Sequence, residues 1–90
     1  MQEQLTSFEQ IVQRGCGMDV HKETVVATVS GSGIKIETRT FATFTNDLYK
    51  LKDWLKSLVI THVAMGSTGI YWKPVFNILE EDFEILLVRA

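Results

Sequence analysis

Asp19 is the residue of this sequence whose type and position best suit chemistry, because it interrupts a short apolar run at residues 18–20. A carboxylate within an apolar strand is costly unless it is paired, hydrogen-bonded or bound to metal. His21 and Lys22 follow directly, as a pair suited to contacting phosphate. The simpler alternative is that Asp19 ends its strand and bonds backbone amides, with His21 at the strand end and Lys22 in solvent.

A second polar segment, Gly-Ser-Thr-Gly at residues 66–69, follows a short apolar strand predicted at residues 61–65. Ser67 and Thr68 are expected to cap the next helix. The alternative is that their amides and hydroxyls hold a phosphate at its N-terminus.

Three further residues have structural interpretations. Tyr71 and Trp72 are predicted to lie in the core, and the alternative is that they stack on nucleic-acid bases. Cys16 is predicted to be a small buried hydrophobe, since no partner for a nucleophile is evident.

The elements that must position these residues follow from hydrophobic spacing and turn residues. Gly15-Cys16-Gly17 is expected to separate an N-terminal arm from the first strand, and Ser30 to Gly33 to form a hairpin turn. Thr45 or Asn46 is expected to cap the first helix, which carries a leucine stripe. Strands are predicted at residues 18–20, 24–29, 34–41, 61–65 and 84–88, and helices over the leucine stripe at 48–58 and over 71–81.

Two of these strands carry informative patterns. Residues 34–41 alternate, with Lys35, Glu37 and Arg39 on one face, which predicts an outer strand with one wet side. Residues 85–88, Ile-Leu-Leu-Val, form a continuous apolar run that suits a parallel strand buried on both faces.

The order strand, strand, strand, helix, strand, helix, strand predicts a meander followed by parallel strands. In such an α/β sheet the first strand lies beside the fourth, and function gathers near the carboxyl ends of the strands. Asp19 is therefore expected to face residues 66–69 across a strand spacing of ~4.8 Å.

The composition limits the classes of function that this chain could have. The chain has 90 residues, 46% apolar and 22% charged, which is enough for one domain and argues against wholesale disorder. The net charge of −2 is not that of a free-standing basic nucleic-acid binder, and one cysteine excludes an internal disulfide framework. Residues 1–14 are predicted to be an arm with helical spacing rather than a signal peptide. No membrane segment is expected, and a cytoplasmic protein is the default.

Two stretches together resemble a known family. Residues 17–22, Gly-Met-Asp-Val-His-Lys, and residues 67–75, Ser-Thr-Gly-Ile-Tyr-Trp-Lys-Pro-Val, resemble the RuvC-like DEDD insertion-sequence transposases, which are related to the Piv DNA invertases. The resemblance covers residues 15–90. It implies a ribonuclease H-like mixed α/β sheet and DNA strand cleavage and joining with Mg²⁺ or Mn²⁺.

The resemblance also implies four acidic metal ligands, Asp-Glu-Asp-Asp, and Asp19 matches the first of them. The second family acid directly precedes Ser-Thr-Gly, where this chain has Gly66, which cannot ligate through a carboxylate. The last two acids belong to a later part of the family's domain. The chain is therefore expected to be an incomplete N-terminal fragment, inactive alone, that binds metal weakly or not at all.

Partners implied by the resemblance are insertion-sequence ends and target DNA, further copies of the chain and a structured guide RNA, with Lys22, Ser67 and Thr68 as nucleic-acid contacts. The main alternative is a non-catalytic module that acts through protein contacts, favoured by Gly66 and the acidic balance. A third interpretation, an actin-like sugar kinase, shares the element order. That fold usually has glycine two positions after its first Asp, and this chain has His21 there.

Overall fold

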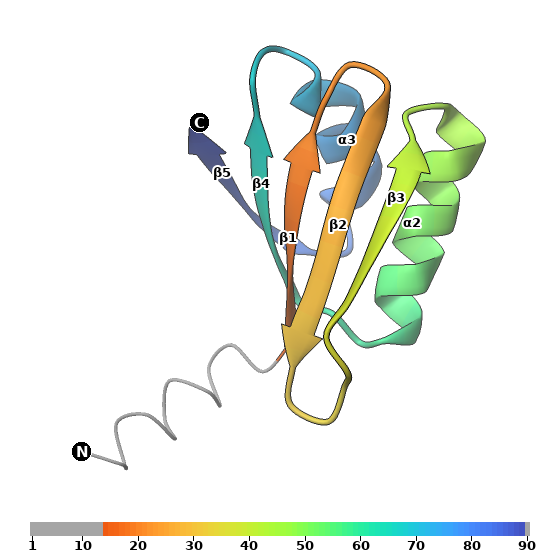
Figure 1. Cartoon of the computed structure of the whole chain (residues 1–90), viewed down its shortest axis with the longest axis vertical. Coiled ribbons are helices and arrows are strands. Elements are labelled where there is room, and N and C mark those ends of the chain that lie inside the picture. The colour runs from red at the N-terminus through yellow and green to blue at the C-terminus, as the bar shows by residue number, and fades with distance from the viewer. Residues whose placement is uncertain (1–13, 90) are drawn as a thin grey trace.

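The computed structural model describes residues 14–89, and the predicted N-terminal arm lies almost wholly outside this range. Five strands form one sheet in the order β3-β2-β1-β4-β5 (Figure 1). β1 pairs antiparallel with β2, and β2 with β3, whereas the pairs β1–β4 and β4–β5 are parallel. The predicted order of elements is confirmed. The elements are β1 (Arg14–Val20), β2 (Thr24–Gly31), β3 (Glu37–Ala42), α2 (Thr45–Ser57), β4 (His62–Ser67), α3 (Trp72–Leu79) and β5 (Glu84–Arg89).

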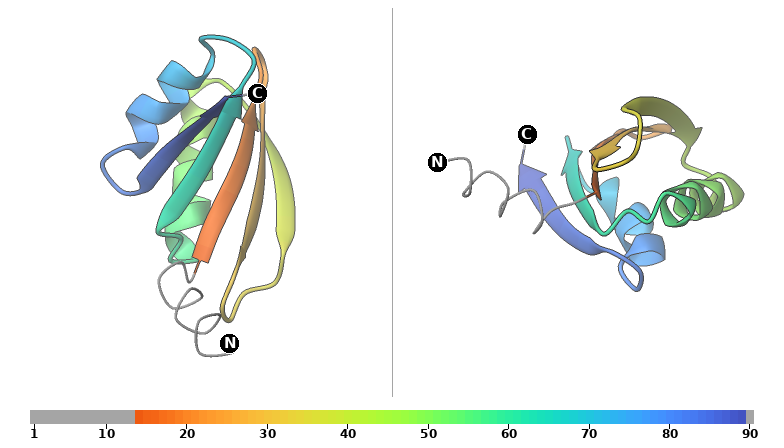
Figure 2. Two further views of the ribbon diagram at one scale, coloured as in Figure 1. Left: turned by 90° about the vertical axis from the view of Figure 1, so that its left-hand side faces the viewer. Right: turned by 90° about the horizontal axis from the view of Figure 1, so that it is seen from below.

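Both helices cover the same face of the sheet, and among residues 14–89 no element covers the other face (Figure 2). Successive side chains of a strand point to opposite faces, so the strands bury alternate residues beneath the helices. The helices contribute mainly leucine to this core. The largest fully buried side chains are Leu48, Leu51, Leu55, Met65, Leu79, Val20, Val25, Val29, Val63 and Val75.

β1 is longer than predicted, because Gly15, Cys16 and Gly17 belong to the strand instead of separating it from the arm. Cys16 points into the core, whereas Gly17 lies on the helix-free face. Arg14 holds the start of the strand in place. Its guanidinium donates to the backbone carbonyls of Ser32 at 2.8 Å and Leu58 at 2.7 Å.

The ends of α2 differ from the prediction. The N-cap position is Phe44, without a side-chain cap, so neither Thr45 nor Asn46 has the expected capping role. At the other end the amide of Val59 donates to the Lys56 carbonyl, and the amide of Ile60 donates to the Leu55 carbonyl. This is a Schellman arrangement, and it places Val59 in the left-handed region at φ 56°.

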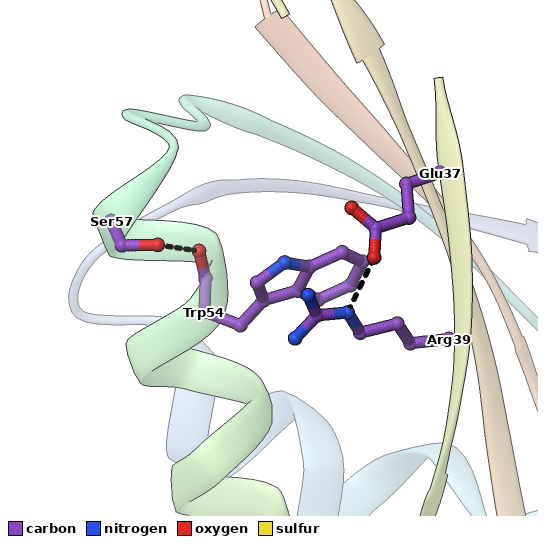
Figure 3. A network of polar contacts seen from close by, with 4 residues as sticks. All are labelled: Glu37, Arg39, Trp54 and Ser57. Atoms are coloured by element: carbon purple, nitrogen blue, oxygen red, sulfur yellow. Dashed lines mark hydrogen bonds and ion pairs between the residues drawn. The ribbon is translucent and has the colours of Figure 1, made fainter. Parts of the chain in front are cut away.

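β3 is an edge strand, as predicted, but it begins at Glu37 rather than residue 34, and β2 extends through Gly31 into the expected turn. The charged face is exposed, as predicted, but the opposite face is exposed as well, since residues 37–40 are all exposed. Arg39 lies on the side of α2, with its guanidinium carbon 4.6 Å from the ring centroid of Trp54 and its Nε 2.8 Å from Glu37 (Figure 3). A guanidinium covers an aromatic face favourably, so this charged side can pack against a helix.

β5 is not buried on both faces. Leu86, Leu87 and Val88 are 66%, 44% and 46% exposed. The strand forms one edge of the sheet, and the two helices cover only one face (Figures 1 and 2). An apolar run is buried on both sides only where both faces of the sheet are covered. Within residues 14–89 no helix is both long and apolar enough for a membrane span.

Candidate functional site

Asp19 and Gly66 are direct partners in the parallel ladder between β1 and β4. Both strands run toward the same end of the sheet, at which β1 turns into β2 and β4 leads into α3 (Figure 1). This confirms the expected position of Asp19 opposite the segment 66–69. A hollow of about 160 Å³ lies there, lined mainly by Asp19, His21, Gly66, Ser67 and Thr68.

The side chain of Asp19 is exposed on the helix-free face, while its neighbours Met18 and Val20 are buried under the helices. The carboxylate is therefore not desolvated by the apolar residues around it in the sequence. No hydrogen bond or ion pair from the side chain of another residue of the range 14–88 stabilises it. Its exposed position makes its oxygens accessible to a ligand from solvent.

Gly66 sits where a side chain has room. A Cβ built on its backbone would lie 3.8 Å from Oδ1 of Asp19 and 3.7 Å from the Met18 carbonyl, both ordinary contacts. Neither space nor backbone conformation demands glycine, since Gly66 is not among the glycines with positive φ. A longer side chain from this position would project beside the Asp19 carboxylate on the same face.

The turn after β1 presents His21 and Lys22 at the same edge. The amide of His21 donates to the Thr24 carbonyl at 2.8 Å, which closes the turn. The Thr43 hydroxyl donates to the Lys22 carbonyl at 3.0 Å, which ties the turn to the end of β3. His21 lines the Asp19 hollow, whereas Lys22 lines a separate one.

Ser67 and Thr68 lie beside Asp19 but do not cap α3. The N-cap position of this helix is Tyr71, without a side-chain cap, and α3 begins at Trp72. The Ser67 hydroxyl instead hydrogen-bonds within its own turn, donating to the Gly69 carbonyl at 3.2 Å. β4 continues through Ser67 and α3 begins only at Trp72, so both hydroxyl residues lie several positions before the helix.

The two aromatic residues at the start of α3 differ in their surroundings. Trp72 is half-buried, and its ring packs edge-on against Phe76 with centroids 5.7 Å apart. Tyr71 is 40% exposed, so the prediction that it belongs to the core was wrong. Tyr71 lines a hollow of about 370 Å³ together with Lys22, Thr43 and Lys73. Lys73 was not among the predicted site residues, although it lies in the second family-like stretch.

The Asp19 hollow holds only one of the four acidic ligands that the family implies for its metal centre. Mg²⁺ in proteins is held by one or two carboxylates with phosphate and water, and this chain offers Asp19 opposite a residue without a side chain. Within residues 14–89 no group of three or more His, Cys, Asp or Glu side chains is placed to hold a metal. The residues described do not by themselves fit the metal centre implied by the family.

Cys16 takes no part in this site. It is buried in the core, and burial raises the pKa of its thiol to about 12, against a smaller lowering by a hydrogen bond from the Thr28 backbone. The thiolate is the nucleophilic form, so this residue is inert at neutral pH. The prediction of a small buried hydrophobe is confirmed.

Solved structures similar to this chain share its fold. They include a Bacteroides thetaiotaomicron protein with an actin-like ATPase fold and unknown function, at TM-score 0.59 and 14% identity over 94% of this chain and 37% of that chain. A ROK hexokinase from Thermus thermophilus matches at TM-score 0.55 and 15% identity, over 86% of this chain and 34% of that one. The chain thus spans about a third of these proteins, and the low identities show the fold alone.

The family of this chain is identified by sequence comparison, not by the similar structures. No curated protein matches the chain. A family model described as a transposase, DEDD_Tnp_IS110, matches residues 16–90, which include Asp19, Gly66 and the turn between β4 and α3. The chain belongs to the IS110 family of DEDD transposases.

Proposed function

We propose that this chain supplies the first part of the catalytic domain of a protein that cleaves and rejoins insertion-sequence DNA, with Asp19 as the first of the family's acidic metal ligands. The observation that carries the proposal is the direct pairing of Asp19 with Gly66, the position that precedes Ser-Thr-Gly. A carboxylate at that position would share one face and one hollow with Asp19.

In this proposal the polypeptide alone does not cleave DNA. Of the two acidic positions that fall within the matched region, only Asp19 carries a carboxylate. Two-metal DNA cleavage needs ions that stabilise both the attacking and the leaving oxygen, and a single carboxylate is too few ligands to hold them. Partners would be insertion-sequence ends, target DNA, further copies of the chain and a structured guide RNA.

The test is restoration of the missing carboxylate. The Gly66→Glu variant is expected to bind Mn²⁺ more tightly than the unsubstituted chain in calorimetric titration. The gain is expected to disappear in the Asp19→Asn/Gly66→Glu double variant. Ser30→Glu is the matched control. Ser30 pairs with Gly15 at the opposite end of β1, so this substitution adds the same charge far from Asp19. An unchanged titration for Gly66→Glu would count against the paired site.

A nicking assay tests the predicted inactivity. Supercoiled DNA incubated with the chain and Mg²⁺ or Mn²⁺ is expected to remain intact, with no difference between the chain and Asp19→Ala. Robust nicking that is lost in Asp19→Ala would refute the proposal that this chain is inactive.

A non-catalytic interaction module is the second candidate, and the exposed apolar side chains of β5 favour it. Leu86, at 66% exposure, lies on an edge strand that is open to pairing. This function requires neither Asp19 nor a metal. Continuation of the reading frame into two further acidic residues and a C-terminal domain would favour the recombinase.

A further inference from the structure

The hollow formed by the turn after β1 and the first turn of α3 brings together two lysines that are 51 positions apart in sequence, Lys22 and Lys73. We propose that it binds the phosphodiester backbone of a DNA strand, with the two ammonium groups on phosphate and Tyr71 against a base or sugar. The inference deepens the proposed function and rests on it for the choice of DNA as ligand. It concerns a different hollow from that of Asp19.

Neither lysine of this hollow forms an ion pair with another described residue. The ion pairs between described residues are Glu37–Arg39 and those of Asp82 with Lys52 and Lys56, so neither Lys22 nor Lys73 is neutralised by such a pair. Both side chains are exposed. Two ammonium groups at one concave site, neither of them paired with a described carboxylate, attract a polyanion and release its counterions on binding.

The backbone that presents these lysines is held in place. The Thr43 hydroxyl fixes the carbonyl of Lys22 at 3.0 Å, and the amide of Lys73 donates to the Ile70 carbonyl at 3.3 Å. Each lysine therefore extends from a hydrogen-bonded turn. This reduces the backbone ordering that ligand binding would otherwise require.

The remaining lining suits a nucleotide better than a free ion. Ile70 is 73% exposed and Tyr71 40% exposed, and both line the hollow together with the lysines. An aromatic ring stacks on any base without regard to sequence, and an apolar neighbour supports the sugar. A volume of about 370 Å³ is in the range of small-ligand sites.

The position of the hollow suits a strand that also approaches Asp19. His21 lines the Asp19 hollow and Lys22 lines the lysine hollow, so consecutive residues of one turn border both. Residues from the segments that follow β1 and β4 line both hollows, and these two segments lie at the same end of the sheet (Figure 1). A phosphate held by Lys22 and Lys73 would thus anchor DNA close to the acidic position.

The experiment measures binding of a fluorescently labelled single-stranded DNA 20-mer by anisotropy, in EDTA and over a range of salt. The Lys22→Ala/Lys73→Ala variant is expected to bind about tenfold more weakly at low salt. Its slope of log affinity against log salt is expected to fall by about 1.4, since each phosphate contact to a single strand contributes about 0.7. The Lys22→Arg/Lys73→Arg variant is expected to retain binding.

Lys35→Ala/Lys50→Ala is the matched control, because it removes the same charge from two exposed lysines outside the hollow. Equal weakening in both double variants, or no binding by the unsubstituted chain, would overturn the proposal. Tyr71→Ala is expected to weaken binding about fivefold through lost stacking, and Tyr71→Phe to leave it unchanged. Circular dichroism confirms that each variant is folded.

A 20-mer RNA of the same sequence is the second arm. If the lysine substitutions weaken the binding of RNA but not of DNA, the assignment of the hollow to DNA is overturned. Because the assay contains EDTA, its result is separate from the Mn²⁺ titration of Gly66→Glu. If the lysine variant loses DNA binding and the Mn²⁺ titration of Gly66→Glu is unchanged, the phosphate site is supported and the acidic metal centre is contradicted.

Discussion

A Cβ atom built at Gly66 would lie 3.8 Å from Oδ1 of Asp19, and the two residues are paired directly between parallel strands. This geometry determines whether a second carboxylate can be placed beside Asp19. One side chain is already in place, and the position opposite is empty but unobstructed. A single substitution therefore suffices to place two carboxylates on one face.

The space at Gly66 gives a first prediction. Gly66→Ala is expected to stabilise the chain by about 0.5–1 kcal/mol, because glycine within a strand loses more conformational freedom on folding than alanine. The new methyl group would make only ordinary contacts, at 3.7–3.8 Å. Urea denaturation measures the change. A destabilised variant would mean that the space beside Asp19 is not open, and Gly66→Glu would then be a poor test of the metal site.

The left-handed residue after α2 gives a second prediction. Val59 has φ 56° and is 63% exposed, so its β-branched side chain strains the backbone and buries little. Val59→Gly is expected to stabilise the chain by about 1 kcal/mol, since glycine is the preferred residue at this position of a Schellman motif.

Thermal unfolding measures this effect, and about 1 kcal/mol corresponds to roughly 4–8 °C in a domain of this size. Val59→Ile is the control, because it retains the branched Cβ and is expected to give no gain. A lower melting temperature for Val59→Gly would show that the left-handed geometry is not a source of strain.

The ion pair between Lys52 and Asp82 gives a prediction about pH. The hydrogen bond from Lys52, at 2.9 Å, holds the pKa of Asp82 below its ordinary value, and Lys56 adds to the effect. A group with a lowered folded-state pKa stabilises above its unfolded-state pKa, and this stabilisation is lost as pH falls through the folded-state value. The stability difference between the chain and Asp82→Asn is therefore expected to be present at neutral pH and to vanish in acid.

Chemical denaturation between pH 2 and pH 7 measures the difference. Asp53→Asn is the matched control, because Asp53 is exposed on the same helix as Lys52 and forms no ion pair with another residue of the range 14–88. The difference is also expected to shrink in high salt, since the pair is partly exposed. A difference that persists unchanged below pH 3 would contradict a role for the Asp82 charge.

The buried thiol gives a fourth prediction. Burial raises the pKa of Cys16 to about 12, so at pH 8 a disulfide reagent is expected to react slowly with the folded chain and rapidly with the chain in urea. Since the raised pKa favours the protonated form on folding, stability is expected to fall as pH rises from about 9 toward 12. Cys16→Ala removes this part of the pH dependence. Fast labelling under native conditions would show that β1 opens readily.

Much of the fold was predictable because local rules decide it. The leucine spacing in residues 48–58 specifies a helix with one apolar face, and the β-branched residues at 24–29 specify a strand. Three strands in a meander followed by helical crossovers leave few arrangements of the sheet, and this one places Asp19 beside Gly66. The first acidic position, Asp19, and the missing acid at Gly66 could therefore be predicted from the sequence.

The face that each residue presents was decided only by the tertiary structure. Residue type did not reveal that Asp19 faces solvent, that Arg39 packs over Trp54, or that Leu86 stays exposed at an edge. Burial depends on which face of the sheet the helices cover, and a strand of six residues does not encode that. The sequence by itself determined the order of the elements and the position of the acid. Only packing, which joins turns distant along the chain, brought Lys22 and Lys73 to the same hollow.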